Sequence, residues 1–334
     1  MNLRSLKSND PNVRYRGVLG LDKQGQGSKE VIDGLVEVLK KDKNTNVRVY
    51  TVIALGNIGQ GSQQAIDVLI GAFKNKDEDL NIRVHAVRAL GNIGQGSQQA
   101  IDELIEALKD EDPNVRGYAV RALGNIGQES KEVVKALIPF LSDDEYFIRR
   151  ERVIALGKMK VSSDKVTSGL IRALGDPDKE VQTTAHDALI KHGKSAVPQL
   201  IGQFGNISSL NIVDILIDTE EGAVDDLTLA LKSDNFIVRG NSAQALGMII
   251  GINGIKVSDK KLNSIITELI NIASKDTNRK ERDGRIAVIQ SLSHFGPRAK
   301  EAIPTLQQIV ENPRNHISLK QAGKDALNKI NQEK

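Results

Sequence analysis

The sequence predicts an all-α fold, an α–α superhelix in which short helical hairpins stack into a solenoid. The 14-residue segment from Ala54 to Asp67 returns unchanged 35 residues later, from Ala89 to Asp102. Such self-similarity at a fixed period indicates a structural repeat. An arginine that follows Val or Ile also recurs at intervals of 34, 35, 33 and 33 residues, as Arg14, Arg48, Arg83, Arg116 and Arg149. Apolar residues between these arginines follow helical spacing.

The fourth repeat shows how its first helix begins and ends. Asp112 is predicted to cap a helix starting at Pro113, because its carboxylate can accept free backbone N–H groups and proline at the first position lacks a donor anyway. Gly127 is predicted to end the helix in the left-handed conformation. One apolar stripe runs between them at helical spacing and consists of Val115, Ala119, Ala122, Leu123 and Ile126.

A second helix follows in the same repeat. Ser130 stands where it can cap this helix, whose apolar stripe is formed by Val134, Leu137, Ile138 and Leu141. Neither helix can bury its stripe alone. The hairpin must therefore stack on copies of itself, and those interfaces supply the core.

The same interpretation divides residues 1–206 into six regular repeats, near 10–41, 42–75, 77–110, 112–143, 144–175 and 176–206. Residues 207–334 are expected to hold divergent repeats and a C-terminal cap within one continuous solenoid. A shortened hairpin is predicted at 210–217 and 223–231, and a lengthened helix end with a glycine-broken loop at 248–256. A regular unit at 281–312 and a closing helix at 316–330 complete about nine repeats plus a cap.

Composition excludes several classes of site. The chain has no cysteine, so it forms no disulfide, thiolate metal site or cysteine nucleophile. Its formal net charge of +3 is too small to indicate a polyanionic partner. No apolar run near residue 1 or elsewhere suggests a signal peptide or a membrane span. We therefore expect a cytoplasmic protein without membrane association.

The repeat pattern Asp-x-Asn-Val-Arg, Ala-Leu-Gly-x-Ile-Gly and Ala-Ile-x-x-Leu-Ile-x-Ala-Leu is carried almost entire by residues 112–141. It resembles HEAT repeats of the short phycobilisome-lyase-like (PBS lyase HEAT-like) subclass, strongly over 10–204 and more weakly over 235–330. The resemblance implies a right-handed superhelix with first helices on the convex side and second helices lining a concave groove. It also implies that the recurrent arginines form a structural ladder with loop acids, for which Asp42, Asp79, Asp112 and Asp144 stand nearby.

The second helices offer the candidate binding site. Helical geometry points one set of their positions away from the apolar stripe and toward the groove. These positions are largely small residues, with acidic side chains toward the N-terminus and basic ones near residues 165–172. Small residues let a partner approach the backbone, and charges orient it. The alternative of a merely solvated face stays open. The predicted partner-binding residues are Glu30, Glu37, Gln64, Gln99, Glu103, Glu106, Glu132, Lys165 and Arg172.

No catalytic, metal or cofactor site is predicted. Deoxyhypusine hydroxylases resemble this chain in repeat length but need repeated His-Glu ligands, whereas the nearest motif here is a single His186-Asp187. Nucleic-acid binding is not expected, because acids interrupt the basic run from Lys275 to Arg285 and no aromatic residues are interleaved. The apolar stretch 248–256 is either a docking point or a packing element.

The function that the sequence favours is a non-enzymatic scaffold that binds a partner protein in the concave groove. The resemblance also implies an alternative, a phycobilin lyase or isomerase, or a chromophore chaperone, acting on phycobiliproteins. In that case the client would provide the cysteine and the protein would hold a bilin. A cysteine-free chain is compatible with both functions.

Overall fold

The computed structural model describes residues 3–25, 27–76, 78–127, 129–139, 142–159, 164–206, 209–219, 221–275 and 281–332. All regular elements among these residues are helices, which pair into successive hairpins, so the predicted all-α, solenoid-type fold class is confirmed. The chain divides into two compact units. Unit 1 holds residues 1–173 and 177–185, and unit 2 holds residues 174–176 and 186–334. The predicted change of register at residue 207 and the continuity of the array stay predictions.

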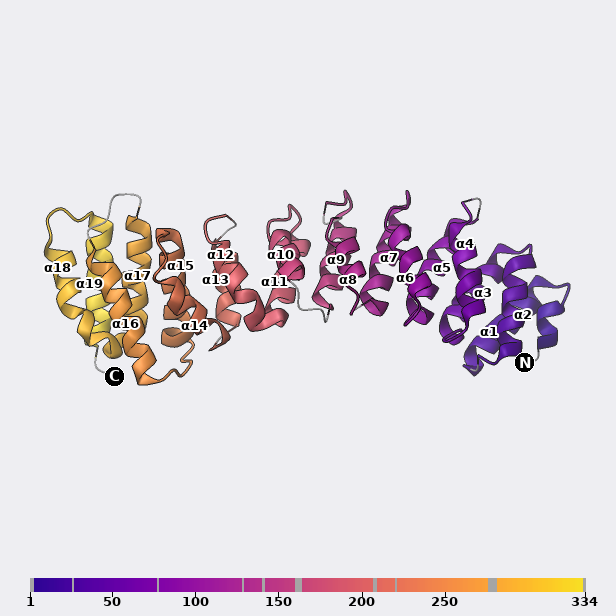
Figure 1. Ribbon diagram of the computed structural model, residues 1–334, viewed down its shortest axis with the longest axis horizontal. Helices are drawn as coiled ribbons and strands as arrows, with labels where there is room; N and C mark the ends of the chain where they lie inside the picture. Colours follow the sequence, from indigo (N-terminus) through magenta and orange to yellow (C-terminus); the bar gives the residue numbers. More distant parts are fainter. Residues whose placement is uncertain are drawn as a thin grey trace. The chain divides into compact units, whose positions relative to one another are not determined.

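Unit 1 consists of helical hairpins in chain order, drawn from indigo to magenta in Figure 1. A short 3₁₀ helix, η1 (Leu3–Lys7), precedes them. The first helices are α1 (Pro11–Gln24), α3 (Thr45–Ile58), α5 (Leu80–Ile93), α7 (Pro113–Ile126) and α9 (Tyr146–Gly157). The second helices are α2 (Lys29–Lys41), α4 (Gln63–Lys74), α6 (Gln98–Ala107), α8 (Lys131–Leu137) and α10 (Asp164–Ala173).

Unit 2 continues the hairpin pattern with more irregular helices, and the division between the units falls within α11 (Lys179–His192). The predicted shortened hairpin and closing helix are both present, as α13 with α14 and as α19. The helices are α12 (Val197–Gly202), α13 (Ser209–Asp218), α14 (Glu221–Ala230), α15 (Phe236–Leu246), α16 (Asp259–Ser274), α17 (Arg282–His294), α18 (Ile303–Glu311) and α19 (Ile317–Asn331).

Two layers build the core of unit 1. The first helices α1, α3, α5, α7 and α9 pack on one another in chain order, the second helices α2, α4, α6 and α8 do the same, and each of these four also contacts the first helix that follows it. The apolar stripes meet between the layers, where Leu55, Leu90 and Leu123 are fully buried. A single hairpin could not exclude water from these side chains, so the stacking of neighbours creates the hydrophobic interior.

The predicted helix starts are confirmed. The Asp112 carboxylate accepts the Asn114 backbone N–H at 2.8 Å, and Pro113 is the first residue of α7. The Ser130 hydroxyl accepts the Val133 N–H at 3.2 Å and starts α8. The helix α8 ends at Leu137, with Ile138 as its C-cap residue, and the predicted stripe residue Leu141 lies outside the described residues.

Gly127 does end α7 as predicted, but it does not adopt the predicted left-handed conformation. Its φ is −102°, so it is not left-handed, and the same holds for the equivalent Gly59 at −84°. Glycine is needed there for space, because a Cβ on Gly127 would lie 2.5 Å from a Val133 methyl and 2.9 Å from the Leu123 carbonyl oxygen. The left-handed residue stands two positions later in the identical segments, at Gly61 (φ 79°) and Gly96 (φ 82°).

Small residues set the distance between consecutive first helices. Gly91 of α5 faces Ala122 of α7, and a Cβ on Gly91 would lie 2.5 Å from the Ala122 Cβ. The same contact repeats between Gly56 and Ala89 one hairpin earlier, at 2.7 Å. We call these pairs, together with Gly124 and Ala155, the glycine–alanine seam. It brings the backbones of the first helices into direct contact.

The predicted lengthened helix end in unit 2 is a π-helical turn, η3 (Gly247–Ile252), which follows α15 directly. The predicted glycine break is Gly254, with φ 71°. Ile249 and Ile250 are buried, and Gly251 fits against the backbone of His294 in α17. Residues 249–251 are therefore a packing element, whereas Ile252 is 58% exposed and residues 253, 254 and 256 are exposed as well.

Candidate functional site

Two features that the sequence singled out lie in unit 1, the recurrent arginines and the face of the second helices. The arginines bridge consecutive repeats. In Arg14, Nε and Nη2 donate to the two carboxylate oxygens of Asp42 at 2.6 and 2.8 Å, and Nη1 donates to the Ser8 and Asn9 carbonyls. One side chain therefore ties the loop before its own helix to the loop before the next repeat.

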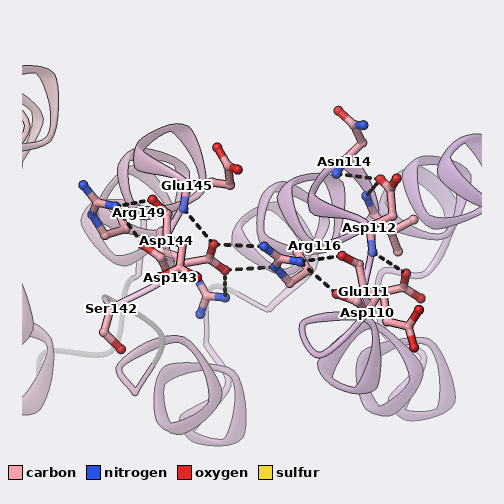
Figure 2. Close-up of polar contacts among 12 residues, drawn as sticks. Asp110, Glu111, Asp112, Asn114, Arg116, Ser142, Asp143, Asp144, Glu145 and Arg149 are labelled. Atoms are coloured by element: carbon pink, nitrogen blue, oxygen red, sulfur yellow. Dashed lines mark hydrogen bonds and ion pairs between the residues drawn. The ribbon is translucent and has the colours of Figure 1, made fainter.

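The same arrangement recurs around Arg116, as Figure 2 shows. Its Nε and Nη2 donate to Asp143 at 3.0 and 3.1 Å, and its Nη1 donates to the Asp110 and Glu111 carbonyls at 3.0 Å. In the next repeat, Arg149 donates from Nη1 to the Asp143 carbonyl at 2.7 Å. Bidentate pairing between arginine and a carboxylate fixes geometry as well as charge.

The acids predicted for this ladder need correction. Asp42 does pair with Arg14, but Arg48 pairs with Glu78 and Arg83 pairs with Asp110. The expected partners Asp79 and Asp112 cap α5 and α7 instead. Asp144 contributes its carbonyl to Arg149. The signal that could have found the true acids is their position, because each lies one or two residues before a capping residue.

The buried acids of the ladder are held ionised. Burial alone would raise the pKa of Asp42, but the hydrogen bonds from Arg14 and the Asn44 backbone N–H outweigh it and lower the pKa. Asp143 follows the same logic, since burial opposes ionisation while Arg116 and the Glu145 N–H lower its pKa. These arginines and acids are engaged with each other, which supports the structural role predicted for them.

The arginine ladder continues in unit 2, beyond the five arginines that were predicted to form it. Arg239 donates to the Ser233 carbonyl at 2.7 Å, and Arg285 donates from Nε to the Ala273 carbonyl at 2.7 Å. Arg285, the last residue of the predicted basic run, is thus buried and hydrogen-bonded to the end of α16, the helix that precedes its own. Arg279 and Lys280, from the same run, lie outside the described residues.

The fifth hairpin differs from the preceding one in a buried arginine, Arg152. It stands in α9 at the position that Ala119 occupies in α7, and its side chain is fully buried. Its Nη1 lies 3.5 Å from the Leu137 carbonyl, at the end of the short helix α8, and its Nη2 lies 3.8 Å from Asp143. Burial lowers the pKa of Arg152 to about 10.

The second-helix face of unit 1 holds the predicted partner-binding residues. All nine are on α2, α4, α6, α8 or α10. Glu103 is partly buried and the other eight are exposed. Val68 of α4, at the position equivalent to Glu103, is only 8% exposed and packs inside instead of facing the groove. Gly71 stays open, since a Cβ added to it would have no atom within 4 Å.

Two of the predicted residues interact with their own helix starts. Glu30 and Glu132 lie in the first turns of α2 and α8, and for each a hydrogen bond from its own backbone N–H, followed by one from the N-cap serine, lowers the pKa. The Ser130 hydroxyl donates to Glu132 at 2.8 Å. These carboxylates therefore stabilise helix starts, as negative charge does at a helix N-terminus.

Other predicted residues pair across the face. Lys74 of α4 donates to Glu103 of α6 at 2.8 Å, and Gln63 donates to Gln99 at 2.7 Å. Among the described residues, Glu37 pairs with Lys41 of its own helix and Glu106 pairs with Lys109, which lies just after the end of α6; all four side chains are largely exposed. Exposed pairs of this kind contribute little to stability, so Glu37 and Glu106 are available to a ligand.

Two open hollows lie on this face. One of about 800 Å³ lies between η1 and α2 and is lined in part by Glu30, Gly34 and Glu37. Another of about 370 Å³ lies between α2 and α4 and is lined in part by Gln64 and Gly71. Lys165 and Arg172 are exposed on α10. The structure thus places Glu30 and Glu37 at one hollow and Gln64 at the other.

Metal binding and membrane spanning find no support among the described residues. In the part of the chain that the structure describes, no three histidine, aspartate or glutamate side chains gather in a way that could hold a metal ion. His186 and Asp187 lie 3.7 Å apart as neighbours on α11. None of the described helices is both long enough and apolar enough to pass through a lipid bilayer.

Comparison with known families agrees with this geometry. The family model for HEAT repeats matches residues 3–81, 75–157 and 101–190, which together cover more than half of the chain. The chain therefore belongs to the HEAT-repeat family. No curated protein sequence matches it.

Solved structures show the same fold. A structure of importin β is 12% identical, with a TM-score of 0.51, over 98% of this chain and 52% of that chain. A structure of Kap95p is 13% identical, with a TM-score of 0.51, over 98% of this chain and 55% of that chain. An engineered protein is 19% identical over 99% of this chain and 100% of its own, with a TM-score of 0.43. The chain spans about half the length of the importin β and Kap95p chains.

Proposed function

We propose that this protein is a non-enzymatic scaffold that binds a partner protein in a groove along the second helices of unit 1. The observation that carries the proposal is the pair of hollows beside α2 and α4, one lined by the exposed charges of Glu30 and Glu37 and the other by the open backbone of Gly71. Gly71 lets a partner approach the helix closely, and Glu37 can orient it.

The ion pairs of the face support this role. The ladder arginines and their acids form ion pairs between consecutive repeats. Glu37, Glu106 and Arg172 are exposed and, among the described residues, form no ion pair with a neighbouring repeat. Repeat arrays present extended surfaces of this kind to other proteins. Kap95p, of similar fold, is described as binding RanGDP, although likeness at this identity concerns fold alone.

Charge reversal tests the groove. Glu37→Lys, Glu106→Lys and Arg172→Glu would be combined in one variant, and proteins cross-linked to it in cells would be compared with those of the unaltered chain. A control variant with the same net charge change, Glu301→Lys, Glu311→Lys and Arg314→Glu, alters exposed residues of unit 2. We expect the groove variant to lose partners that the control retains. Identical recovery by both variants would reject the groove.

The bilin lyase alternative, and with it the phycobilisome-lyase-like subclass, stays a prediction. Neither hollow of the second-helix face has an aromatic side chain in its lining, and flat chromophores are commonly flanked by aromatic rings. Absorption spectra of a free bilin with and without the protein test it. A scaffold leaves the spectrum unchanged, whereas a chromophore-binding protein shifts it.

A further inference from the structure

The loop between the π-helical turn η3 and α16 contains Asn253-Gly254, the one Asn-Gly pair of the sequence. Both residues are exposed. Asparagine is a chemically labile residue. The backbone nitrogen of the residue that follows it can attack its side-chain amide, and glycine obstructs this attack least because it has no side chain. The surroundings of the pair decide whether the reaction is open to the folded protein.

The side-chain amide of Asn253 is not held by the fold. It forms no hydrogen bond within the described residues. Asn315, in the loop before α19, shows the contrast, because its amide donates to the Ile309 carbonyl at 2.9 Å. Asn315 is also followed by His316, whose side chain would crowd an attacking nitrogen. Asn253 therefore differs from another loop asparagine both in its freedom and in the residue that follows it.

The attacking nitrogen is equally free. On one side of it, the Asn253 N–H donates to the Met248 carbonyl at 2.9 Å, and on the other side the Ile255 N–H donates to the Ile249 carbonyl at 3.2 Å. The Gly254 N–H between them donates to no acceptor among the described residues. The fold thus fixes both flanks of the pair and leaves the peptide group between Asn253 and Gly254 without a hydrogen bond from its nitrogen.

This peptide group has to rotate before the reaction can occur. Asn253 has φ −74° and ψ −11°, and Gly254 has φ 71°. A planar peptide group turns as one unit when ψ of the first residue and φ of the second change in opposite senses, so the flanking hydrogen bonds can stay in place. Glycine adopts negative and positive φ with similar ease, and a Cβ added to Gly254 would have no atom within 4 Å. The rotation therefore meets neither a steric nor a hydrogen-bonding obstacle.

We propose that Asn253 is a site of spontaneous deamidation in the folded protein. The Gly254 nitrogen loses its proton and forms a bond to Cγ of Asn253, the bond from Cγ to Nδ2 breaks, and ammonia leaves with that proton. The product is a cyclic succinimide. Water, the co-reactant, then opens the ring. Attack at Cγ gives aspartate, and attack at the backbone carbonyl carbon of residue 253 gives isoaspartate. No atom is oxidised or reduced.

The modification changes an exposed apolar stretch of unit 2. Either product places a new negative charge directly after Ile252, which is 58% exposed. Isoaspartate also adds a methylene group to the backbone between the hydrogen bonds of the Asn253 and Ile255 N–H groups. The site is independent of the second-helix groove of unit 1, so either proposal can fail without the other.

Mass spectrometry of the whole protein, incubated at mildly alkaline pH and then digested with trypsin, tests the proposal. Cleavage after Arg239 and Lys256 releases residues 240–256, which also contain Asn241 of α15 as an internal control. We expect a mass increase of about 1 Da at Asn253 and none at Asn241. A synthetic peptide of residues 248–258 gives the rate without the fold, and the folded protein should react within about ten-fold of that rate.

Two variants test the roles of the pair, with circular dichroism spectra confirming that both fold. Asn253→Gln should stop the reaction at this position, because glutamine would have to close a larger ring. Gly254→Ala should slow it about five-fold or more, because the added methyl group crowds the attacking nitrogen. A folded protein that reacts more than about ten-fold slower than the peptide would overturn the proposal. Equal modification of Asn241, or an unchanged rate in Gly254→Ala, would also overturn it.

Discussion

The glycine–alanine seam predicts that the same substitution has opposite effects at two glycines. Gly91→Ala places a Cβ 2.5 Å from the Ala122 Cβ and 2.8 Å from its Cα. Carbon atoms in contact prefer about 3.5–4.0 Å, so α5 and α7 must separate by about 1 Å. Neither contacting atom belongs to a flexible side chain. The seam therefore cannot adapt by changing a rotamer.

The magnitude follows from two opposing effects. Overpacking of a core contact costs about 1–3 kcal/mol, and alanine stabilises a helix interior over glycine by about 0.5–1 kcal/mol. We expect Gly91→Ala to lower the free energy of unfolding by about 1–2 kcal/mol. Gly71→Ala in α4 meets no atom within 4 Å. It should raise that free energy by about 0.5–1 kcal/mol.

Urea unfolding followed by far-ultraviolet circular dichroism measures both effects. The double variant Gly91→Ala with Ala122→Gly removes the contact between the two Cβ atoms but keeps the contact with the Cα of residue 122, so it should recover only part of the lost stability. If Gly91→Ala is as stable as Gly71→Ala, the close approach of the first helices does not limit packing and the reasoning is refuted.

Two further predictions concern buried charge. Arg152→Met should change the free energy of unfolding by less than about 1 kcal/mol, because well-packed apolar residues often replace buried charges without loss of stability. Arg152→Ala should lower it by about 2–5 kcal/mol, because it leaves a cavity. Equal losses for both variants in urea unfolding would show that the charge itself is needed. The pKa values of Asp42, Asp110 and Asp143 are lowered in the folded state, so their stabilisation is complete above the unfolded value of about 3.9 and is lost as pH falls through the folded values. The melting temperature should fall when the pH is lowered below about 4, and replacing all three aspartates by Asn should make that fall smaller. The same dependence of the melting temperature on pH in both proteins would contradict the prediction.

The fold could be predicted because its signals are local. Helix starts depend on a capping side chain and a backbone N–H a few residues away, as at Asp112 and Ser130, and the apolar stripes repeat at the helical period. The early end of α8, near the buried Arg152, was harder to predict from the sequence. Arg152 occupies a buried position there that is small in the preceding repeat, and the sequence does not reveal where its guanidinium points.

Contacts between repeats were harder to predict. Arg48 pairs with Glu78 rather than the adjacent Asp79 because Asp79 is used by the start of α5. Which of two neighbouring acids faces the arginine depends on the path of the loop. The roles of Glu30 and Glu132 follow from local sequence, since each lies two residues after a capping serine. Their engagement with the helix start could therefore have been anticipated.

The identical segments, 54–67 and 89–102, make the length of this protein adjustable. Excision of residues 54–88 would join Ile53 to Ala89 and leave a helix with the sequence of α3, because both segments begin with the same residues. Gly91 would then still face Ala122, and Arg48 would stand where Arg83 now meets Asp110. A gene encoding such a chain can gain or lose one whole hairpin by recombination while the new junction keeps these two contacts.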